Sequence, residues 1–184
     1  MRLFVALDVV NDEVKRRVKD VQHELLESGA NIKPVDPSIL HMTLKFIGEV
    51  PERNLKEIVD SLEGVKEHEF SLHLYGVGAF PSVRRINVVW VGCSEGGEYA
   101  IDLQKRVEAV LSKWGKPERG FVPHLTILRV KGGSRDAFER LSAAVYRHKD
   151  DDFGTVQYRE FQLKKSVLLP SGPVYETVRA YSLV

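Results

Sequence analysis

Two strand-forming stretches of this 184-residue chain share one pattern. Residues 39–47 read Ile-Leu-His-Met-Thr-Leu-Lys-Phe-Ile, and residues 121–130 read Phe-Val-Pro-His-Leu-Thr-Ile-Leu-Arg-Val. Each contains a His-x-Thr-x core, His41-Met42-Thr43-Leu44 in the first and His124-Leu125-Thr126-Ile127 in the second. Because side chains alternate across a strand, each histidine shares one face with its threonine, while the two apolar residues share the other.

The segments around these stretches recur in the same order. Residues 2–10 predict an opening strand, after which each half reads helix, strand, helix, strand, strand. In the first half, helices are expected between Asn11 and Gly29 and between Pro51 and Gly64, then strands at 69–77 and 86–92 around a turn at Phe80-Pro81-Ser82. In the second half, we expect helices at 98–114 and after Ser134, then strands at 156–168 and 174–183 around a turn at Leu169-Pro170-Ser171.

This order indicates an internal duplication. His41 and His124 are 83 residues apart, and Pro81 and Pro170 are 89 apart, as expected for a repeated unit with a small insertion. No linker is visible, so residues 1–184 are expected to form a single bilobal domain. Amphipathic helices must bury their apolar sides against a sheet. We therefore expect an α+β fold, with two small, mainly antiparallel sheets, helices on their outer faces and a central cleft.

The composition limits the classes of partner. The 27 Lys and Arg residues nearly balance the 26 Asp and Glu residues, which disfavours non-specific DNA binding and a polybasic membrane anchor. No apolar run of about 18 residues predicts a transmembrane helix, and Asp8 comes too early for a signal peptide. The single Cys93 excludes an intrachain disulfide and is expected to be a small buried hydrophobe. These features predict a cytoplasmic protein with neither a DNA nor a membrane partner.

The two motifs suit phosphodiester chemistry. A histidine has an unperturbed pKa of about 6.5, so one ring can accept a proton while the other donates one. Threonine hydroxyls can donate hydrogen bonds to non-bridging phosphate oxygens. Two histidines alone make a poor zinc site, which needs three or four ligands, so no metal and no other cofactor is expected. The alternative is a duplicated structural pair without chemistry, but polar residues on a helix-free sheet face have no packing reason to be there.

The paired motifs, together with the opening Met1–Leu7 and the Pro123–Arg129 segment, resemble a known family. The tetrapeptides are similar to the signature of the 2H phosphoesterase superfamily. The two flanking segments resemble its branch of bacterial and archaeal RNA 2′,3′-cyclic phosphodiesterases, also called 2′-5′ RNA ligases (the ThpR/LigT group). The resemblance covers essentially the whole chain. It implies a bilobal fold and metal-independent hydrolysis of an RNA 2′,3′-cyclic phosphate to a 2′-phosphomonoester, with 2′-5′ ligation as the reverse reaction.

The resemblance also implies roles for the motif residues. His41 would be the proton donor to the leaving 3′-oxygen, His124 the proton acceptor from the attacking water, and Thr43 and Thr126 the phosphate-binding residues. The motifs are nearly symmetric, so the division into acid and base rests on the family alone. The expected partners are RNA ends, such as those of tRNA fragments, and the expected state is a monomer. A cyclic phosphodiesterase for an ADP-ribose cyclic phosphate and a non-catalytic RNA- or nucleotide-binding module remain as alternatives.

Further candidates lie near the motifs. Strict alternation places Lys45 on the face of His41, where it is a candidate phosphate contact. It places Arg129 on the wrong face for His124 unless a bulge intervenes. The remaining candidates are interpreted by default as ordinary solvated, structural or packing residues. They are Arg84-Arg85 and Lys164-Lys165 for contacts with the RNA backbone, Tyr75, Trp90, Tyr158 and Tyr175 for base stacking, and the histidines His23, His68, His73 and His148.

Overall fold

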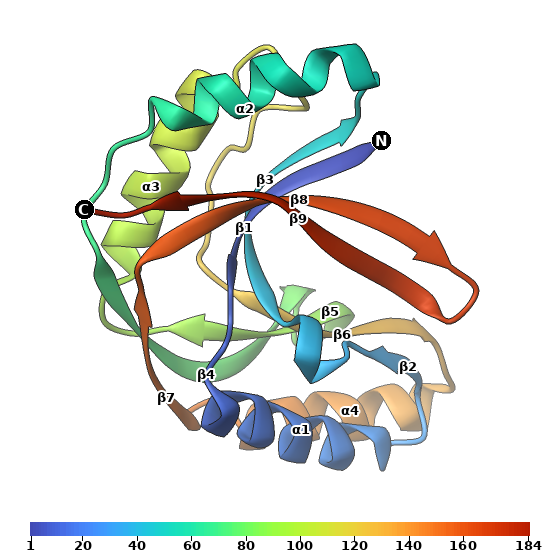
Figure 1. The fold of residues 1–184 in the computed structure, drawn as a ribbon. Coiled ribbons are helices and arrows are strands. Elements are labelled where there is room, and N and C mark those ends of the chain that lie inside the picture. The colour runs from blue at the N-terminus through green and yellow to red at the C-terminus, as the bar shows by residue number, and fades with distance from the viewer.

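The computed structural model describes all 184 residues and contains two antiparallel sheets (Figure 1). The four-stranded sheet contains, in order, β3 (His41–Glu49), β1 (Arg2–Asp8), β8 (Glu160–Leu169) and β9 (Gly172–Ser182). The five-stranded sheet contains β2 (Asn31–Pro34), β6 (Leu125–Gly132), β5 (Arg85–Cys93), β4 (Phe70–Ser82) and β7 (Asp152–Tyr158). The predicted α+β class is confirmed.

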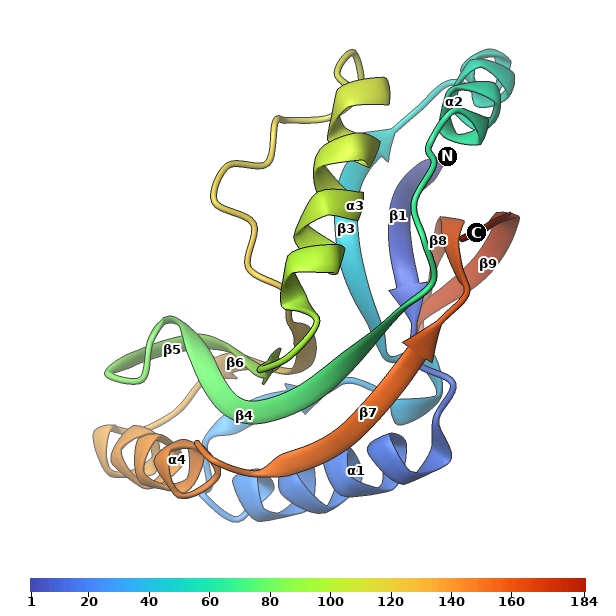
Figure 2. The ribbon, with the colours of Figure 1, turned by 90° about the vertical axis from the view of Figure 1, so that its left-hand side faces the viewer.

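Two helices cover each sheet. The helices α1 (Asp12–Leu26) and α4 (Arg135–Arg147) pack on the five-stranded sheet, and α2 (Leu55–Glu63) and α3 (Gly97–Val110) lie on the other side of the molecule against the four-stranded sheet (Figures 1 and 2). Short 3₁₀ helices at Pro37–Ile39 and Glu52–Asn54 precede β3 and α2. No helix combines the length and the apolar character needed to cross a lipid bilayer.

The helix starts follow the predicted caps. The side chain of Asn11 accepts a hydrogen bond from the backbone N–H of Val14, and Ser134 accepts one from Ala137. Side-chain acceptors of this kind satisfy N–H groups that have no partner within the helix. The apolar side of α1 is buried, since its valines at 14 and 18 are at most 1% exposed.

The third helix is shorter than the predicted 98–114. It ends at Val110, which is exposed, and the next residue, Leu111, is buried instead. Gly115 lies against the edge strand β3, with φ +69°, where a Cβ would collide with the carbonyl oxygen of Phe46. The segment after α3 therefore packs on an otherwise open strand edge, which is one way to protect such an edge from pairing with other chains.

The two predicted hairpin turns have different outcomes. The turn at Pro170-Ser171 is confirmed between β8 and β9. The turn at Phe80-Pro81-Ser82 is wrong, because β4 continues to Ser82 and the chain reverses at Val83-Arg84. Pro81 lies at a shift in the register of β4 and β5, which is one of the few places where a strand accepts a proline.

The two sheets do not correspond to the two halves of the sequence. The predicted strand at 156–168 is two strands, of which β7 pairs with β4 and β8 pairs with β1 in the other sheet. The short β2 was not predicted, and it pairs with β6 from the second half. Each sheet thus contains strands from both halves, and one cluster of 43 buried residues runs through both sheets.

Candidate active site

His41 begins β3, on the face of the sheet that carries no helix. Its neighbour Met42 is fully buried, whereas His41 and Thr43 are half-buried. The imidazole packs against the rings of Phe4 and Tyr175, with centroid distances of 5.1 and 5.2 Å. Its Nδ1 lies 2.9 Å from the carbonyl oxygen of Ile39, which only accepts, so Nδ1 carries the proton. This tautomer leaves Nε2 free to exchange a proton.

His124 repeats this arrangement directly before β6. Leu125 is fully buried, while His124 and Thr126 are half-buried on the helix-free face of the five-stranded sheet. Its Nδ1 lies 2.6 Å from the carbonyl oxygen of Val122, and its ring meets Phe80 edge-to-face at 5.0 Å. In both motifs the carbonyl two residues before the histidine therefore fixes the tautomer and the direction of the ring.

Both motif strands have a β-bulge directly after the threonine. In β3, Thr43 pairs with Ala6 and Lys45 with Val5, so Leu44 is the extra residue. In β6, Thr126 pairs with Trp90 and Leu128 with Val89, so Ile127 is the extra residue. An extra residue reverses the alternation of the side chains beyond it.

The bulges bring the fifth position after each histidine onto the motif face. In β3 this position is Phe46, which is 60% exposed, and its ring lies 6.4 Å from that of Phe4. In β6 it is Arg129, which is exposed and takes part in no ion pair or side-chain hydrogen bond. Arg129 therefore lies on the face of His124, because the bulge that this placement requires is present. Phe46 was missed by the sequence analysis, because nothing in the local sequence marks the bulge.

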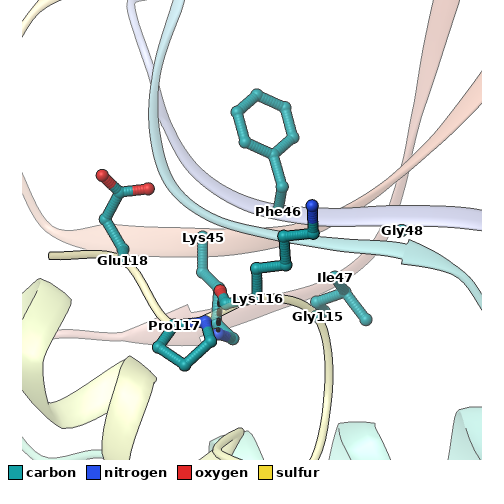
Figure 3. Close-up of a pocket in the computed structure, with 8 residues that line it drawn as sticks. All are labelled: Lys45, Phe46, Ile47, Gly48, Gly115, Lys116, Pro117 and Glu118. Atoms are coloured by element: carbon teal, nitrogen blue, oxygen red, sulfur yellow. Dashed lines mark hydrogen bonds between the residues drawn. The ribbon is translucent and has the colours of Figure 1, made fainter.

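The same bulge removes Lys45 from the motif face. Lys45 is 2% exposed, and its ammonium donates to Glu108 of α3 at 2.8 Å and to the carbonyl of Lys116 at 3.4 Å. Figure 3 shows the side chains of Lys45 and Phe46 leaving β3 in opposite directions. The prediction that Lys45 shares the face of His41 is wrong. Residues 45–48 and 115–118 line a cavity of about 380 Å³ beside Phe46.

His41 has a lowered pKa. Burial is the main cause, because it disfavours the charged ring, while the hydrogen bond to Ile39 and the charge of Asp8 act in the opposite direction. The positive charges of Lys164 and Arg129 lower the pKa further. Arg129 belongs to the other sheet, and its strand β6 is in contact with β3.

The default interpretation of Lys164 as a solvated cation is wrong. It is 7% exposed, and its ammonium binds Asp8 at 2.6 Å and the hydroxyl of Thr177 at 3.2 Å. Lys165 is 3.9 Å from Glu176. Arg84 and Arg85 lie at the exposed β4–β5 turn, as a solvated interpretation predicts.

Two of the aromatic candidates lie at the motifs. Tyr175 contacts His41, and Trp90 is directly opposite Thr126. Tyr158 is buried in the core, and Tyr75 lies beside His73. Among the remaining histidines, those with ring contacts follow the structural interpretation: His68 binds the carbonyl of Val184, His73 bonds Ser94 and Asp152, and His148 bonds Glu24 and Asp151.

Cys93 and the acidic residues offer no other reactive centre. Burial raises the pKa of the Cys93 thiol to about 12, so it stays protonated at neutral pH. No group of three or more His, Cys, Asp or Glu side chains is arranged to hold a metal ion.

Comparison with known proteins gives matches over the whole chain. A model of the family described as LigT like phosphoesterase matches twice, at residues 7–90 and 91–175, in agreement with the predicted duplication. An RNA 2′,3′-cyclic phosphodiesterase of Archaeoglobus fulgidus is 39% identical over 183 residues, which cover 98% of this chain and 99% of the relative. One of Methanocaldococcus jannaschii is 36% identical over 185 residues, covering 98% and 100%.

Solved structures share the fold. A crystal structure of a Thermus thermophilus protein superposes with a TM-score of 0.77 at 29% identity, covering 100% of this chain and 98% of the other. Escherichia coli LigT complexed with 3′-AMP superposes with a TM-score of 0.78 at 22% identity, covering 99% and 97%.

Proposed function

The chain belongs to the LigT-like phosphoesterase family, and from that premise we propose that it hydrolyses the 2′,3′-cyclic phosphate of RNA ends to a 2′-phosphomonoester. The observation that carries the proposal is the pair of imidazoles, each held through Nδ1 by a carbonyl and each with a free Nε2. What sets these two rings apart is that each shares a sheet face with a threonine and that the strands β3 and β6 contact each other. Relatives at 36–39% identity that are named for this activity support the same conclusion.

In the proposed reaction, Nε2 of His124 removes a proton from water as its oxygen attacks phosphorus. The bond between phosphorus and the 3′-oxygen breaks, and Nε2 of His41 protonates that oxygen. One proton is thus taken up by His124 and one is released by His41, and the product is a 2′-phosphomonoester. A positioned acid or base typically contributes 10²–10⁴-fold to the rate.

The neighbouring side chains fit the charge that develops on phosphate. Thr43 and Thr126 share the faces of the two histidines, and in this proposal they donate hydrogen bonds to its non-bridging oxygens. Arg129 adds an uncompensated guanidinium, which matches phosphate geometry well. Phe46 presents an exposed ring to which a nucleobase can stack.

The lowered pKa of His41 couples its protonation to the substrate. In the free protein, burial and two nearby cations disfavour the imidazolium that an acid requires. A phosphate anion that binds between the motifs places an opposite charge close to the ring and neutralises Arg129, and both effects raise the pKa of His41. Substrate binding therefore favours the charged form of the acid.

The direct test uses an RNA oligonucleotide that ends in a 2′,3′-cyclic phosphate, incubated with the protein and EDTA. Chromatography should show conversion to the 2′-phosphate, and His41→Ala and His124→Ala should each reduce the rate at least 100-fold. His68→Ala, at a surface histidine that binds only the terminal residue, is the control. Full activity in either motif variant would contradict the mechanism.

The same assay separates the alternatives. An ADP-ribose cyclic phosphate that outcompetes the oligonucleotide would indicate a small-nucleotide enzyme, and tight binding without turnover would indicate a binding module. A substrate with a free 5′-hydroxyl reports 2′-5′ ligation. We also propose a monomeric, cytoplasmic protein, which sedimentation and fractionation would test.

A further inference from the structure

A second cation lies beside Arg129 on the motif face of the five-stranded sheet. Lys33 belongs to the edge strand β2 and is directly opposite Arg129 in the antiparallel pair. The next pair, Ile32 and Val130, is partly buried against the core. Because alternate residues point to opposite faces, Lys33 and Arg129 lie on the helix-free face, with Thr126.

No acidic group compensates these two charges. Lys33 and Arg129 are both exposed, and neither takes part in any of the ion pairs of the structure. Like charges directly opposite each other destabilise a strand pair. The buried cations of the sheets are paired; Lys164, for example, binds Asp8. An unpaired, mutually repelling pair on the motif face therefore points to anionic ligands.

The two cations lie on different strands, Arg129 on the motif strand β6 and Lys33 on its outer neighbour β2. Arg129 shares a strand and a face with Thr126, and that strand contacts β3, which carries His41, so we assign Arg129 to the reacting phosphate of the proposed function. Lys33 is one strand further out, about 4.8 Å in the direction of the hydrogen bonds. A long lysine side chain at that position extends the positive charge past the motif strand, where a second phosphate of an RNA can lie.

We propose that Lys33 binds the phosphodiester immediately 5′ of the terminal nucleotide, so that the enzyme distinguishes the end of an RNA chain from a free nucleoside 2′,3′-cyclic phosphate. This inference rests on the proposed function and deepens it. The ligand is a second, non-reacting phosphate, and the contact gives affinity without base specificity.

The test compares a nucleoside 2′,3′-cyclic phosphate with a dinucleotide that ends in the same group, since the dinucleotide adds one phosphodiester. Lys33→Met should lower kcat/KM for the dinucleotide about tenfold, as expected for one hydrogen bond to a charged group. It should leave the mononucleotide unchanged. Lys33→Arg should retain the preference for the dinucleotide. Lys19→Met, on the outer helix α1, removes the same charge elsewhere and should change neither substrate.

A dinucleotide with a neutral methylphosphonate linkage identifies the contact. Wild-type protein should hydrolyse it about tenfold more slowly than the natural dinucleotide, and Lys33→Met should reduce that rate no further, because the two changes remove one interaction. Equal losses of Lys33→Met on both natural substrates, or no loss on the dinucleotide, would overturn the inference. Absence of hydrolysis of any cyclic phosphate by wild type would instead refute the proposed function.

Discussion

The strands around His41 and His124 have the same backbone but different surroundings. Each histidine is held by the carbonyl two residues before it, and each strand bulges after its threonine. Two aromatic rings enclose His41, whereas one contacts His124. At the fifth position after the histidine, β3 has a phenylalanine and β6 has an arginine.

This difference shows how a duplication can be divided between two roles. Two histidines in identical surroundings would titrate together, and an acid and a base need surroundings that separate them. The shared part of the repeat, the backbone, positions the rings. In the proposed function, the side chains that differ, above all Phe46 and Arg129, separate a side for the base of the nucleotide from a side for its phosphate.

The largest effect is expected from Arg129→Met. Removal of a donor that holds the developing charge typically costs 10²–10³-fold in kcat. Arg129→Lys should recover part of the rate, since it keeps the charge but loses the planar fork. Steady-state kinetics with a cyclic-phosphate oligonucleotide measure both. Arg135→Met, at an exposed arginine paired with Glu139 on α4, is the control, and an equal loss there would show that Arg129 has no special role.

The correction for Lys45 predicts a stability effect. Glu108→Gln leaves the fully buried ammonium of Lys45 without its counter-ion and should lower the free energy of unfolding by about 3 kcal/mol. Urea denaturation measures this change. Lys45→Met removes the buried charge itself and should cost less, while kcat/KM per folded molecule stays near wild type. A specific loss of activity in Lys45→Met would restore Lys45 as a phosphate contact.

Phe46→Ala tests the other side of the comparison. Loss of a stacking platform costs about 1–3 kcal/mol per base, which predicts at least a fivefold loss of kcat/KM. Phe46→Trp should retain activity. An abasic terminal nucleotide should make wild type and Phe46→Ala equal, and a persistent difference on that substrate would show that the ring has another function.

The smallest effect concerns the titration of His41. Its folded pKa lies below the unfolded value of about 6.5. The unfolded chain therefore binds more protons than the folded protein in this range. As a result, the wild type loses stability as the pH falls from about 6.5 through the folded pKa. His41→Gln removes this contribution. When the pH is lowered from 7 to 5, the melting temperature of the variant should therefore rise relative to that of wild type. NMR titration should show the pKa of His41 rising when a 2′-phosphomonoester binds. No rise would contradict the coupling proposed above.

The sequence by itself determined the local structure and the chemistry of the motifs. Capping residues and apolar periodicity defined the helices, and strand alternation put each histidine with its threonine. These features depend on residues within one or two turns, so local sequence is sufficient. The similar spacing of the two motifs and turns also revealed the duplication, which the double family match repeats.

Only the tertiary structure decided which other side chains join the motifs. The bulges at Leu44 and Ile127 arise from the register of β3 with β1 and of β6 with β5, strands that are distant in sequence. One extra residue reversed the faces of the positions that follow, which buried Lys45 and exposed Phe46 and Arg129. The same cause explains why β7 and β8 belong to different sheets and why Lys33 lies beside Arg129. Register is a property of two strands together, and neither strand's own sequence contains it.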